Sequence, residues 1–284
     1  MTGLGRGTGW RRVVWGAAFY ACLCLVCVVF VAPVLWLVSA AFMTRSDITE
    51  TPIHLIPPVW RPQNFVDIFR SGVNIGRYFA NSLFVTSSVV LLNVFFCSLT
   101  GYSLAKFRYP GRDLIFTGIL GTIMVPFNVI VVPLYLTVRQ LGWIDTYQAL
   151  ILPFGMSAFG IFLMRQFIAG IPDDYIAAAR VDGASEPRIF VQIVLPLARP
   201  AITTLAILTF VANWDEFLWP LVVVNSDAHR TLPIGLARFL GQYENQWHLL
   251  MAGSVIAALP VVVLFLAMQR RFLESLGALS GIKG

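Results

Sequence analysis

Long stretches without a charged side chain set the strongest constraint on this sequence. Asp, Glu, Lys and Arg are absent from residues 13–44, 78–105, 114–138, 146–164 and 245–269. A helix needs about 20 predominantly apolar residues to cross the hydrocarbon core of a bilayer, and each stretch meets or approaches that length. Charged residues make up 12% of the chain, against roughly a quarter in soluble domains. We therefore expect a membrane protein built from transmembrane helices.

A sixth stretch, residues 200–224, has the length of a span but contains Asp215 and Glu216. Six spans place both termini on the same side of the membrane. Of the 20 Lys and Arg residues, 13 fall on the side of the termini and 7 on the other side. The more basic side is usually the cytoplasmic one. We therefore predict an all-α polytopic membrane protein with six transmembrane helices and both termini in the cytoplasm.

Several predicted spans contain proline. Bent spans help to form gates and cavities, but proline is also common in membrane helices, so a functional and a neutral interpretation are both open. The prolines that would kink a helix or free backbone carbonyls are Pro126, Pro133, Pro153, Pro220 and Pro260.

Arg11 and Arg12 precede the first span, as basic residues do in a secretory signal peptide. The apolar part of a signal peptide has roughly 7–15 residues, and this uncharged stretch is about twice that length, so we expect it to be retained. Prolines in the following external segment predict irregular chain with one short helix near Asn64–Arg70. The predicted segments are a cytoplasmic tail at 1–12, the first transmembrane helix at 13–43, an external segment at 44–77, a core at 78–268 and a cytoplasmic tail at 269–284.

The segment 169–200 carries the signals of two short helices. Pro172 and the two acidic residues after it are typical of a helix start, and Gly183 stands where such a helix must end and reverse. Ser185 can begin a second helix, which we expect Pro196 and Pro200 to end. We therefore predict a helix-turn-helix on the cytoplasmic side of the membrane.

Two interpretations of this helix-turn-helix are open on physical grounds. A connection between two helices needs only a few residues, so a longer one has room for a separate purpose. A short helix with a face of small residues can dock in a groove of a partner protein and follow its movements. The alternative is a loop that packs only on its own chain.

The first helix and its turn also resemble a known motif. Residues 177–184 read Ala-Ala-Ala-Arg-Val-Asp-Gly-Ala, which is similar to the cytoplasmic signature loop of the inner-membrane permeases of binding-protein-dependent ABC importers. In that family the loop seats in a cleft of the ATPase subunit and transmits its closure to the transmembrane helices. One position departs from the pattern, because Ala177 stands where the family usually has Glu. The resemblance assigns ATPase coupling to Ala177, Ala178, Ala179, Arg180, Asp182, Gly183, Ala184, Phe190 and Pro196.

Further matches in the same order extend the resemblance from about Phe79 to the C-terminus. They indicate the carbohydrate branch of these permeases and the type I ABC importer fold. The resemblance implies a bacterial-type inner membrane, a second homologous permease subunit, ABC ATPase subunits that bind ATP and Mg, and an external solute-binding protein. The matching positions are Asn81-Ser82, 101–111, Pro126, 133–135, 231–233, 269–272 and 281–284.

Residues 213–217 place two carboxylates and an amide inside an apolar stretch. Such groups are costly if they face lipid, so they must face a cavity, a partner or an interface. A solute-facing site and a structural site are both open. Carboxylate and amide oxygens accept protons from sugar hydroxyls, and a Trp offers an apolar face to a sugar ring. The family resemblance places a similar segment along the translocation path, which assigns this role to Asn213, Trp214, Asp215, Glu216 and Phe217.

The sequence lacks the motifs of an enzyme. A phosphate-binding ATPase loop needs a Lys in a Gly-rich turn, and neither Lys106 nor Lys283 follows that pattern. The three histidines have no metal-ligand spacing, and no Ser/His/Asp constellation suggests a hydrolase. We therefore expect no catalytic site, no metal and no cofactor in this chain. No basic cluster is dense enough to suggest nucleic acid as a partner.

These observations together predict a permease subunit of an ABC importer for a sugar or related polar solute, inserted in the lipid bilayer and driven by separate ATPases. One rival is a secondary transporter that uses Asp215 or Glu216 as an ion relay. It leaves the helix-turn-helix at 169–200 unexplained. A second rival is a membrane-embedded enzyme that uses the same two carboxylates as acid and base.

Overall fold

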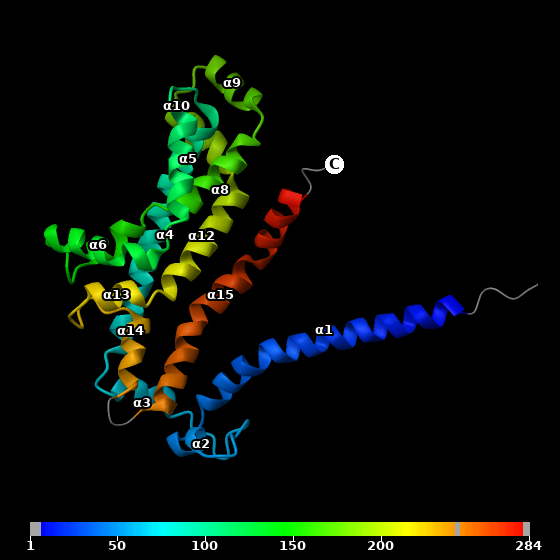
Figure 1. Ribbon diagram of the computed structural model, residues 1–284, viewed down its shortest axis with the longest axis vertical. Coiled ribbons are helices and arrows are strands. Elements are labelled where there is room, and N and C mark those ends of the chain that lie inside the picture. The colour runs from blue at the N-terminus through cyan, green and yellow to red at the C-terminus, as the bar shows by residue number, and fades with distance from the viewer. Residues whose placement is uncertain (1–6, 242–244, 281–284) are drawn as a thin grey trace, which may run out of the picture. The chain divides into compact units, whose positions relative to one another are not determined.

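The computed structural model describes residues 7–241 and 245–280. The outermost parts of both predicted tails, residues 1–6 and 281–284, lie outside the described residues. All named elements of the described chain are helices (Figure 1). The chain forms two compact units, which are Met1–Val73 with Arg238–Ile256, and Asn74–Ala237 with Ala257–Gly284.

The first unit contains the predicted external segment. Its short helix near Asn64 is confirmed, and the side chain of Asn64 fastens this helix to the end of the first span. The fully buried Nδ2 group donates to the carbonyl oxygens of Ala41 and Met43 at 2.9 and 2.8 Å. The helices of this unit are α1 (Gly7–Ala40), α2 (Arg45–Thr49), α3 (Asn64–Arg70) and the start of α15 (Trp247–Ser280).

The second unit contains the predicted core and continues α15 from Ala257. Its long helix α4 packs mainly against α8 and α12. The helices of this unit are α4 (Ile75–Lys106), α5 (Arg112–Ile123), α6 (Phe127–Gln140), α7 (Tyr147–Ile151), the 3₁₀-helix η1 (Leu152–Phe154), α8 (Ala158–Ala169), α9 (Asp173–Val181), α10 (Glu186–Ile189), the π-helix η2 (Phe190–Val194), α11 (Leu195–Leu197), α12 (Arg199–Trp214), α13 (Leu218–Val223) and α14 (Leu232–Leu236).

The number of spans depends on how bent helices are counted. Within the described residues, three helices are long and apolar enough to cross a membrane unbroken, at Trp15–Ala40, Ile75–Lys106 and Trp247–Gln269. Three helix pairs pass the same test together but are bent. The angle is 103° between α5 and α6, 40° between α7–η1 and α8, and 78° between α10–α11 and α12. Each bent pair counted as one span gives a total of six, which is the predicted number, although the third pair covers Glu186–Trp214 and not the predicted 200–224.

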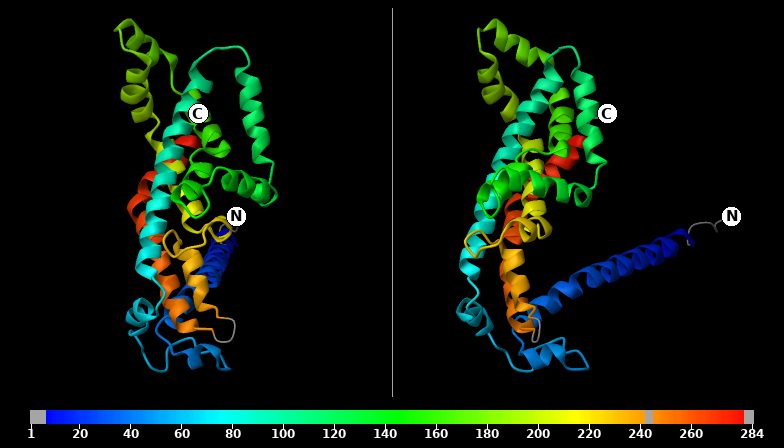
Figure 2. Two further views of the ribbon diagram at one scale, coloured as in Figure 1. Left: turned by 90° about the vertical axis from the view of Figure 1, so that its left-hand side faces the viewer. Right: turned by 60° about the vertical axis from the view of Figure 1, so that its left-hand side comes forward.

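The predicted span at 114–138 is not one straight helix. α5 ends at Ile123, and α6 begins at Phe127 and runs at 103° to α5, so the two form an L (Figure 2). The cause is local, because Pro126 has extended backbone with a ψ of 137°. A proline also lacks the N–H group that would continue the helical hydrogen bonds. Pro126 therefore divides the predicted span into two helices, where the sequence predicted only a kink in one helix.

Two glycines let α4 and α8 approach closely. A Cβ atom at Gly101 of α4 would lie 2.8 Å from Cβ of Met164 and 2.9 Å from the backbone nitrogen of Arg165. On α8, a Cβ atom at Gly160 would lie 2.7 Å from Sγ of Cys97. Small residues allow membrane helices to pack at short distance. Gly101 and Gly160 therefore set the separation of α4 and α8.

Gly101→Val should lower the thermal stability of the purified protein, because the added side chain meets the backbone of α8. Overpacking of this kind costs about 1–3 kcal/mol. Size-exclusion chromatography measures the fraction of the protein that remains monodisperse after heating. Gly118→Val on α5 is the control, because a Cβ atom there meets nothing within 4 Å. Equal losses in the two variants would contradict the close-packing role of Gly101.

Candidate functional site

α9 ends in a turn that needs a residue with left-handed backbone. Gly183 has a φ of 79°, a conformation that costs residues with a side chain about 1–2 kcal/mol. Its N–H donates to the carbonyl of Arg180 at 3.1 Å, and the N–H of Ala184 donates to the carbonyl of Ala179 at 2.9 Å. These two bonds make a Schellman motif, which satisfies the last carbonyls of a helix. The helix end predicted at Gly183 is confirmed.

One side of α9 is buried and the other is accessible. Ile176 and Ala179 pack into a hydrophobic core together with residues of α4 and α8. Val181, at the end of the helix, is 88% exposed. The predicted coupling residues that are exposed on this helix and its turn are Ala177, Ala178, Arg180, Asp182 and Gly183.

Lys106 fastens the start of α9 to the end of α4. Its Nζ donates to Oδ1 of Asp173 at 2.6 Å and to the backbone oxygen of Ile171. The hydrogen bond and the positive charge of Lys106 hold the pKa of Asp173 below its usual value. Asp173 is therefore ionised at neutral pH, and the contact is lost only as the pH falls through its lowered pKa.

Glu186 connects both helices of the 169–200 loop to α4. Its Oε1 accepts from Nε of Arg180 at 2.7 Å, and its Oε2 accepts from the hydroxyl of Tyr102 at 2.8 Å. The ring of Tyr102 also packs against Phe190, with centroids 5.6 Å apart. The sequence analysis assigned no role to Tyr102, Lys106 or Glu186. A usable signal was the rarity of lysine, since Lys106 is one of only two in the chain.

The second helix of the loop ends between the two prolines predicted to end it. It continues through α10, η2 and α11, contains Pro196 and ends at Leu197, before Pro200. The π-helical turn just before Pro196 is wider than an α-helical turn and lies where an α-helix would press a carbonyl against the proline ring. The chain bends instead at Ala198, which precedes α12. Ala179 and Phe190 are buried in this unit, while Ala184 and Pro196 are half-buried.

Trp214, predicted on the translocation path, lies in the protein core. It is 2% exposed, and its Nε1 donates to the carbonyl of Ala257 at 2.9 Å. Its ring stacks on Phe210 at 5.6 Å. The neighbouring Asn213 donates through Nδ2 to the carbonyl of Thr209, one turn earlier, at 3.0 Å. These contacts favour the structural alternative for both residues.

The predicted span at 200–224 is interrupted. α12 ends at Trp214, and α13 begins at Leu218. Glu216 lies in the break, where its Oε1 accepts from the backbone N–H of Trp219 at 3.0 Å. The first N–H groups of any helix lack a partner within that helix. Glu216 therefore has a structural role as a cap of α13.

Asp215 and Phe217 are the members of this segment whose side chains remain exposed. Within the described residues, no hydrogen bond or ion pair engages the carboxylate of Asp215, and Phe217 is 41% exposed. These two side chains are available to a solute or to another subunit. The described part of the chain has no group of three His, Cys, Asp or Glu residues that could hold a metal ion.

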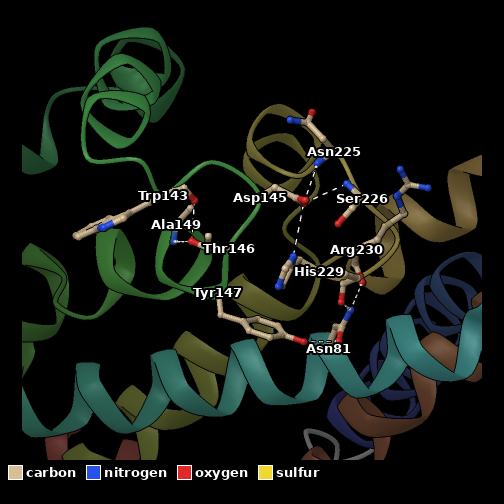
Figure 3. A network of polar contacts seen from close by, with 11 residues as sticks. Asn81, Trp143, Asp145, Thr146, Tyr147, Ala149, Asn225, Ser226, His229 and Arg230 are labelled. Carbon is tan, nitrogen blue, oxygen red and sulfur yellow. Dashed lines mark hydrogen bonds and ion pairs between the residues drawn. The ribbon is translucent and has the colours of Figure 1, made fainter.

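A polar network joins separate segments near the start of α4 (Figure 3). Oδ1 of Asp145 accepts from the backbone N–H groups of Asn225 and Ser226, both at 3.1 Å, and lies 3.6 Å from Nδ1 of His229. Burial raises the pKa of Asp145, but the hydrogen bonds from Ser226 and Asn225 and the nearby His229 outweigh burial, so its pKa is lowered. Asp145 is therefore ionised at neutral pH and holds the loop after α13.

Tyr147 and Asn81 continue this network to α4. The hydroxyl of Tyr147 donates to Oδ1 of Asn81 at 2.8 Å. Nδ2 of Asn81 donates to the carbonyls of Ala228 and Arg230 at 3.0 and 2.9 Å. The ring of Tyr147 meets His229 edge to face, with centroids 4.7 Å apart. The sequence analysis did not predict this network, whose members lie far apart along the chain.

Comparison with known protein families matches residues 94–276 to the family described as binding-protein-dependent transport system inner membrane component. The arabinooligosaccharides transport system permease protein AraQ of Halalkalibacterium halodurans is 38% identical, over 89% of this chain and 91% of AraQ. The diacetylchitobiose uptake system permease protein NgcG of Streptomyces coelicolor is 33% identical, over 92% and 87% of the two chains. The sn-glycerol-3-phosphate transport system permease protein UgpE of Salmonella typhimurium is 33% identical, over 84% and 87%.

Among solved structures, the chain is similar to one chain of a bacterial ABC transporter involved in the import of the acidic polysaccharide alginate. The TM-score is 0.82 at 22% identity, and the match covers 96% of this chain and 100% of the other. At this identity the likeness concerns the fold alone. The fold is the type I permease fold predicted from the sequence.

Asp145→Ala should lower the thermal stability at neutral pH, because it removes the acceptor of two backbone N–H groups. Leaving such donors unsatisfied costs about 1–3 kcal/mol. Thermal unfolding in detergent is measured through the change in tryptophan fluorescence. Folding lowers the pKa of Asp145. The difference in unfolding temperature between the variant and wild type should therefore be largest above the unperturbed pKa of about 3.9, and it should shrink as the pH falls through the lowered pKa of the folded protein.

Asn225→Ala is the matched control for this change, because Asn225 contributes only its backbone N–H to the network. It should unfold at nearly the wild-type temperature. An Asp145→Ala variant as stable as wild type at pH 7 would show that Asp145 does not fasten this loop.

Proposed function

Because this chain belongs to the family of inner membrane components of binding-protein-dependent transport systems, we propose that it forms, with a second homologous permease subunit, the translocation path for a sugar or oligosaccharide. As a permease component it is a transport subunit and not an enzyme. Separate ABC ATPase subunits bind ATP and Mg and supply the energy, and an external solute-binding protein delivers the solute. The observation that carries the proposal is an exposed helix-turn-helix fastened to the end of α4.

The solute class follows from the relatives and from one exposed carboxylate. AraQ is named for arabinooligosaccharides, NgcG for diacetylchitobiose and UgpE for sn-glycerol-3-phosphate. All these solutes carry hydroxyl groups. The carboxylate of Asp215 can accept protons from hydroxyls, and Phe217 offers an apolar face to a sugar ring. We assign these two residues to the translocation path, with Asn213, Trp214 and Glu216 as their structural support.

Coupling to the ATPases occurs through the 169–200 loop. Ala177, Ala178 and residues 180–183 are exposed, and an exposed short helix of this kind can dock in a groove of a partner. The contacts of Lys106 with Asp173, and of Glu186 with Tyr102, join the loop to α4. A push on the loop when the ATPases close therefore moves α4, and alternating access follows from that movement.

The orientation completes the proposal. The loop and both tails, 1–12 and 269–284, lie on the cytoplasmic side, and the segment 44–77 lies outside. The C-terminal tail continues α15 to Ser280 and reaches toward the ATPases. The side chains of the tail from Arg270 onward lie outside the described residues.

Gly183→Pro should leave the protein in the membrane but abolish stimulation of ATP hydrolysis by the solute-loaded binding protein. Proline cannot adopt a φ of 79° and has no N–H group to donate to Arg180. The measurement is ATP turnover of the complete transporter in proteoliposomes. Gly183→Asn is the matched control, because Asn tolerates left-handed backbone, and it should keep most of the stimulation. Normal stimulation in the proline variant would count against coupling through this turn.

Asp215→Asn should raise the solute concentration needed for half-maximal uptake by about fivefold, because a hydrogen bond to a charged acceptor is worth roughly 1 kcal/mol more than a neutral one. Glu216→Gln should have a smaller effect, because its amide oxygen can still accept from the N–H of Trp219. The measurement is uptake of labelled solute into proteoliposomes. A larger defect in Glu216→Gln would contradict the assignment of Asp215. Uptake without any ATPase would favour a secondary transporter.

A further inference from the structure

Residues 53–60, which we call the 53–60 loop, expose large apolar side chains on the first unit. Single apolar residues are common on protein surfaces, whereas a contiguous apolar patch indicates contact with a partner or a membrane. The function proposed above assigns no role to this patch. Its five side chains, which are 62% to 73% exposed, are Ile53, Leu55, Ile56, Val59 and Trp60.

The start of the loop folds back along α1. Nε1 of Trp36 donates to the carbonyl oxygen of His54 at 3.2 Å, and Oγ of Ser39 donates to the carbonyl oxygen of Leu55 at 2.6 Å. Trp36 lies four residues before Ala40, the last residue of α1. At a rise of 1.5 Å per residue, the loop reaches about 6 Å back along the helix from its end.

The other end of the loop is fastened as well. The N–H of Arg61 donates to the carbonyl of Phe42 at 2.9 Å. The ring of Trp60 packs against the ring of Phe42, with centroids 5.3 Å apart. Tryptophan is enriched where membrane and water meet. The backbone is thus held at both ends, while the five apolar side chains remain exposed.

The surface of α1 near the loop is apolar and exposed. The span Trp15–Ala40 is apolar, and none of its most apolar window is buried within the described residues. A point about 6 Å inside the end of a span lies near the boundary of headgroups and acyl chains, where interfacial elements insert about 5–10 Å deep. The Lys and Arg distribution places this end of α1 outside, so the boundary belongs to the outer leaflet.

The chemistry of the loop suits a site with little water. No charged residue occurs at 51–60. Pro57 and Pro58 have no N–H group that could remain unpaired in a lipid environment. The carbonyl groups of His54 and Leu55 already accept hydrogen bonds from α1.

We propose that the 53–60 loop is a membrane anchor that inserts its apolar side chains into the interface of the outer leaflet beside α1. Lipid is favoured over a protein partner because the patch continues the apolar surface of α1 and has no charge with which to select a partner. The anchor fixes the outer end of α1 at the interface, together with α3, which Asn64 ties to the same place. The inference needs only the external placement of 44–77, and not the solute or the coupling proposed above.

A depth measurement with a nitroxide spin label tests the anchor. Ile56→Cys is labelled in the full chain after replacement of the four native cysteines. The complete transporter is reconstituted without its binding protein into vesicles of phosphatidylethanolamine and phosphatidylglycerol. Relaxation of the label is measured with oxygen, which concentrates in lipid, and with a water-soluble nickel chelate. Gln63→Cys is the control, because Gln63 is exposed on the same external segment beyond the loop.

The label at Ile56 should relax more strongly with oxygen than with the nickel chelate, and the label at Gln63 should show the opposite. Strong relaxation by nickel at Ile56, reduced by the binding protein, would reveal a water-exposed docking surface and overturn the proposal. Weak relaxation by both agents would reveal burial against another subunit and overturn it too. The same pattern with Val59→Cys would show that the result belongs to the loop and not to one label.

Discussion

Inside a bilayer there is no water to bond the backbone N–H groups that a break in a helix leaves free. This chain has several such breaks within its apolar stretches, and a polar side chain lies at the helix start after two of them. Ser157 accepts a backbone N–H at the start of α8 and Glu216 at the start of α13. These two residues therefore help to make bent spans possible.

The helix α4 connects two polar clusters. At one end, Tyr102 and Lys106 hold the loop between α8 and α12. At the other end, Asn81 joins the network around Asp145, and Oγ of Ser82 accepts from the backbone N–H at the start of α14 at 2.8 Å. Because α4 is unbroken over 32 residues, a displacement at one end is carried to the other. The family pattern at Asn81-Ser82 thus has a physical explanation.

Sequence reasoning was accurate where the signal was local. The end of α9 depends only on the local backbone conformation of Gly183. The short helix Asn64–Arg70 follows directly after the prolines of the external segment. Apolarity alone does not distinguish a straight span from two helices that meet at 103°, so the size of the bend at Pro126 could not be predicted. The burial of Trp214 was missed for a different reason, since its hydrogen-bond partner Ala257 lies 43 residues later in the chain.

The turn after α9 is also ordered by its own hydrogen bonds. Both of its backbone bonds form within this chain, so the docking surface is ordered before any partner arrives. Fixing one backbone residue costs about 1–2 kcal/mol of conformational entropy, and a preformed surface avoids that cost on association. A partner that docks on this turn, as proposed above, therefore meets a surface whose backbone is already ordered.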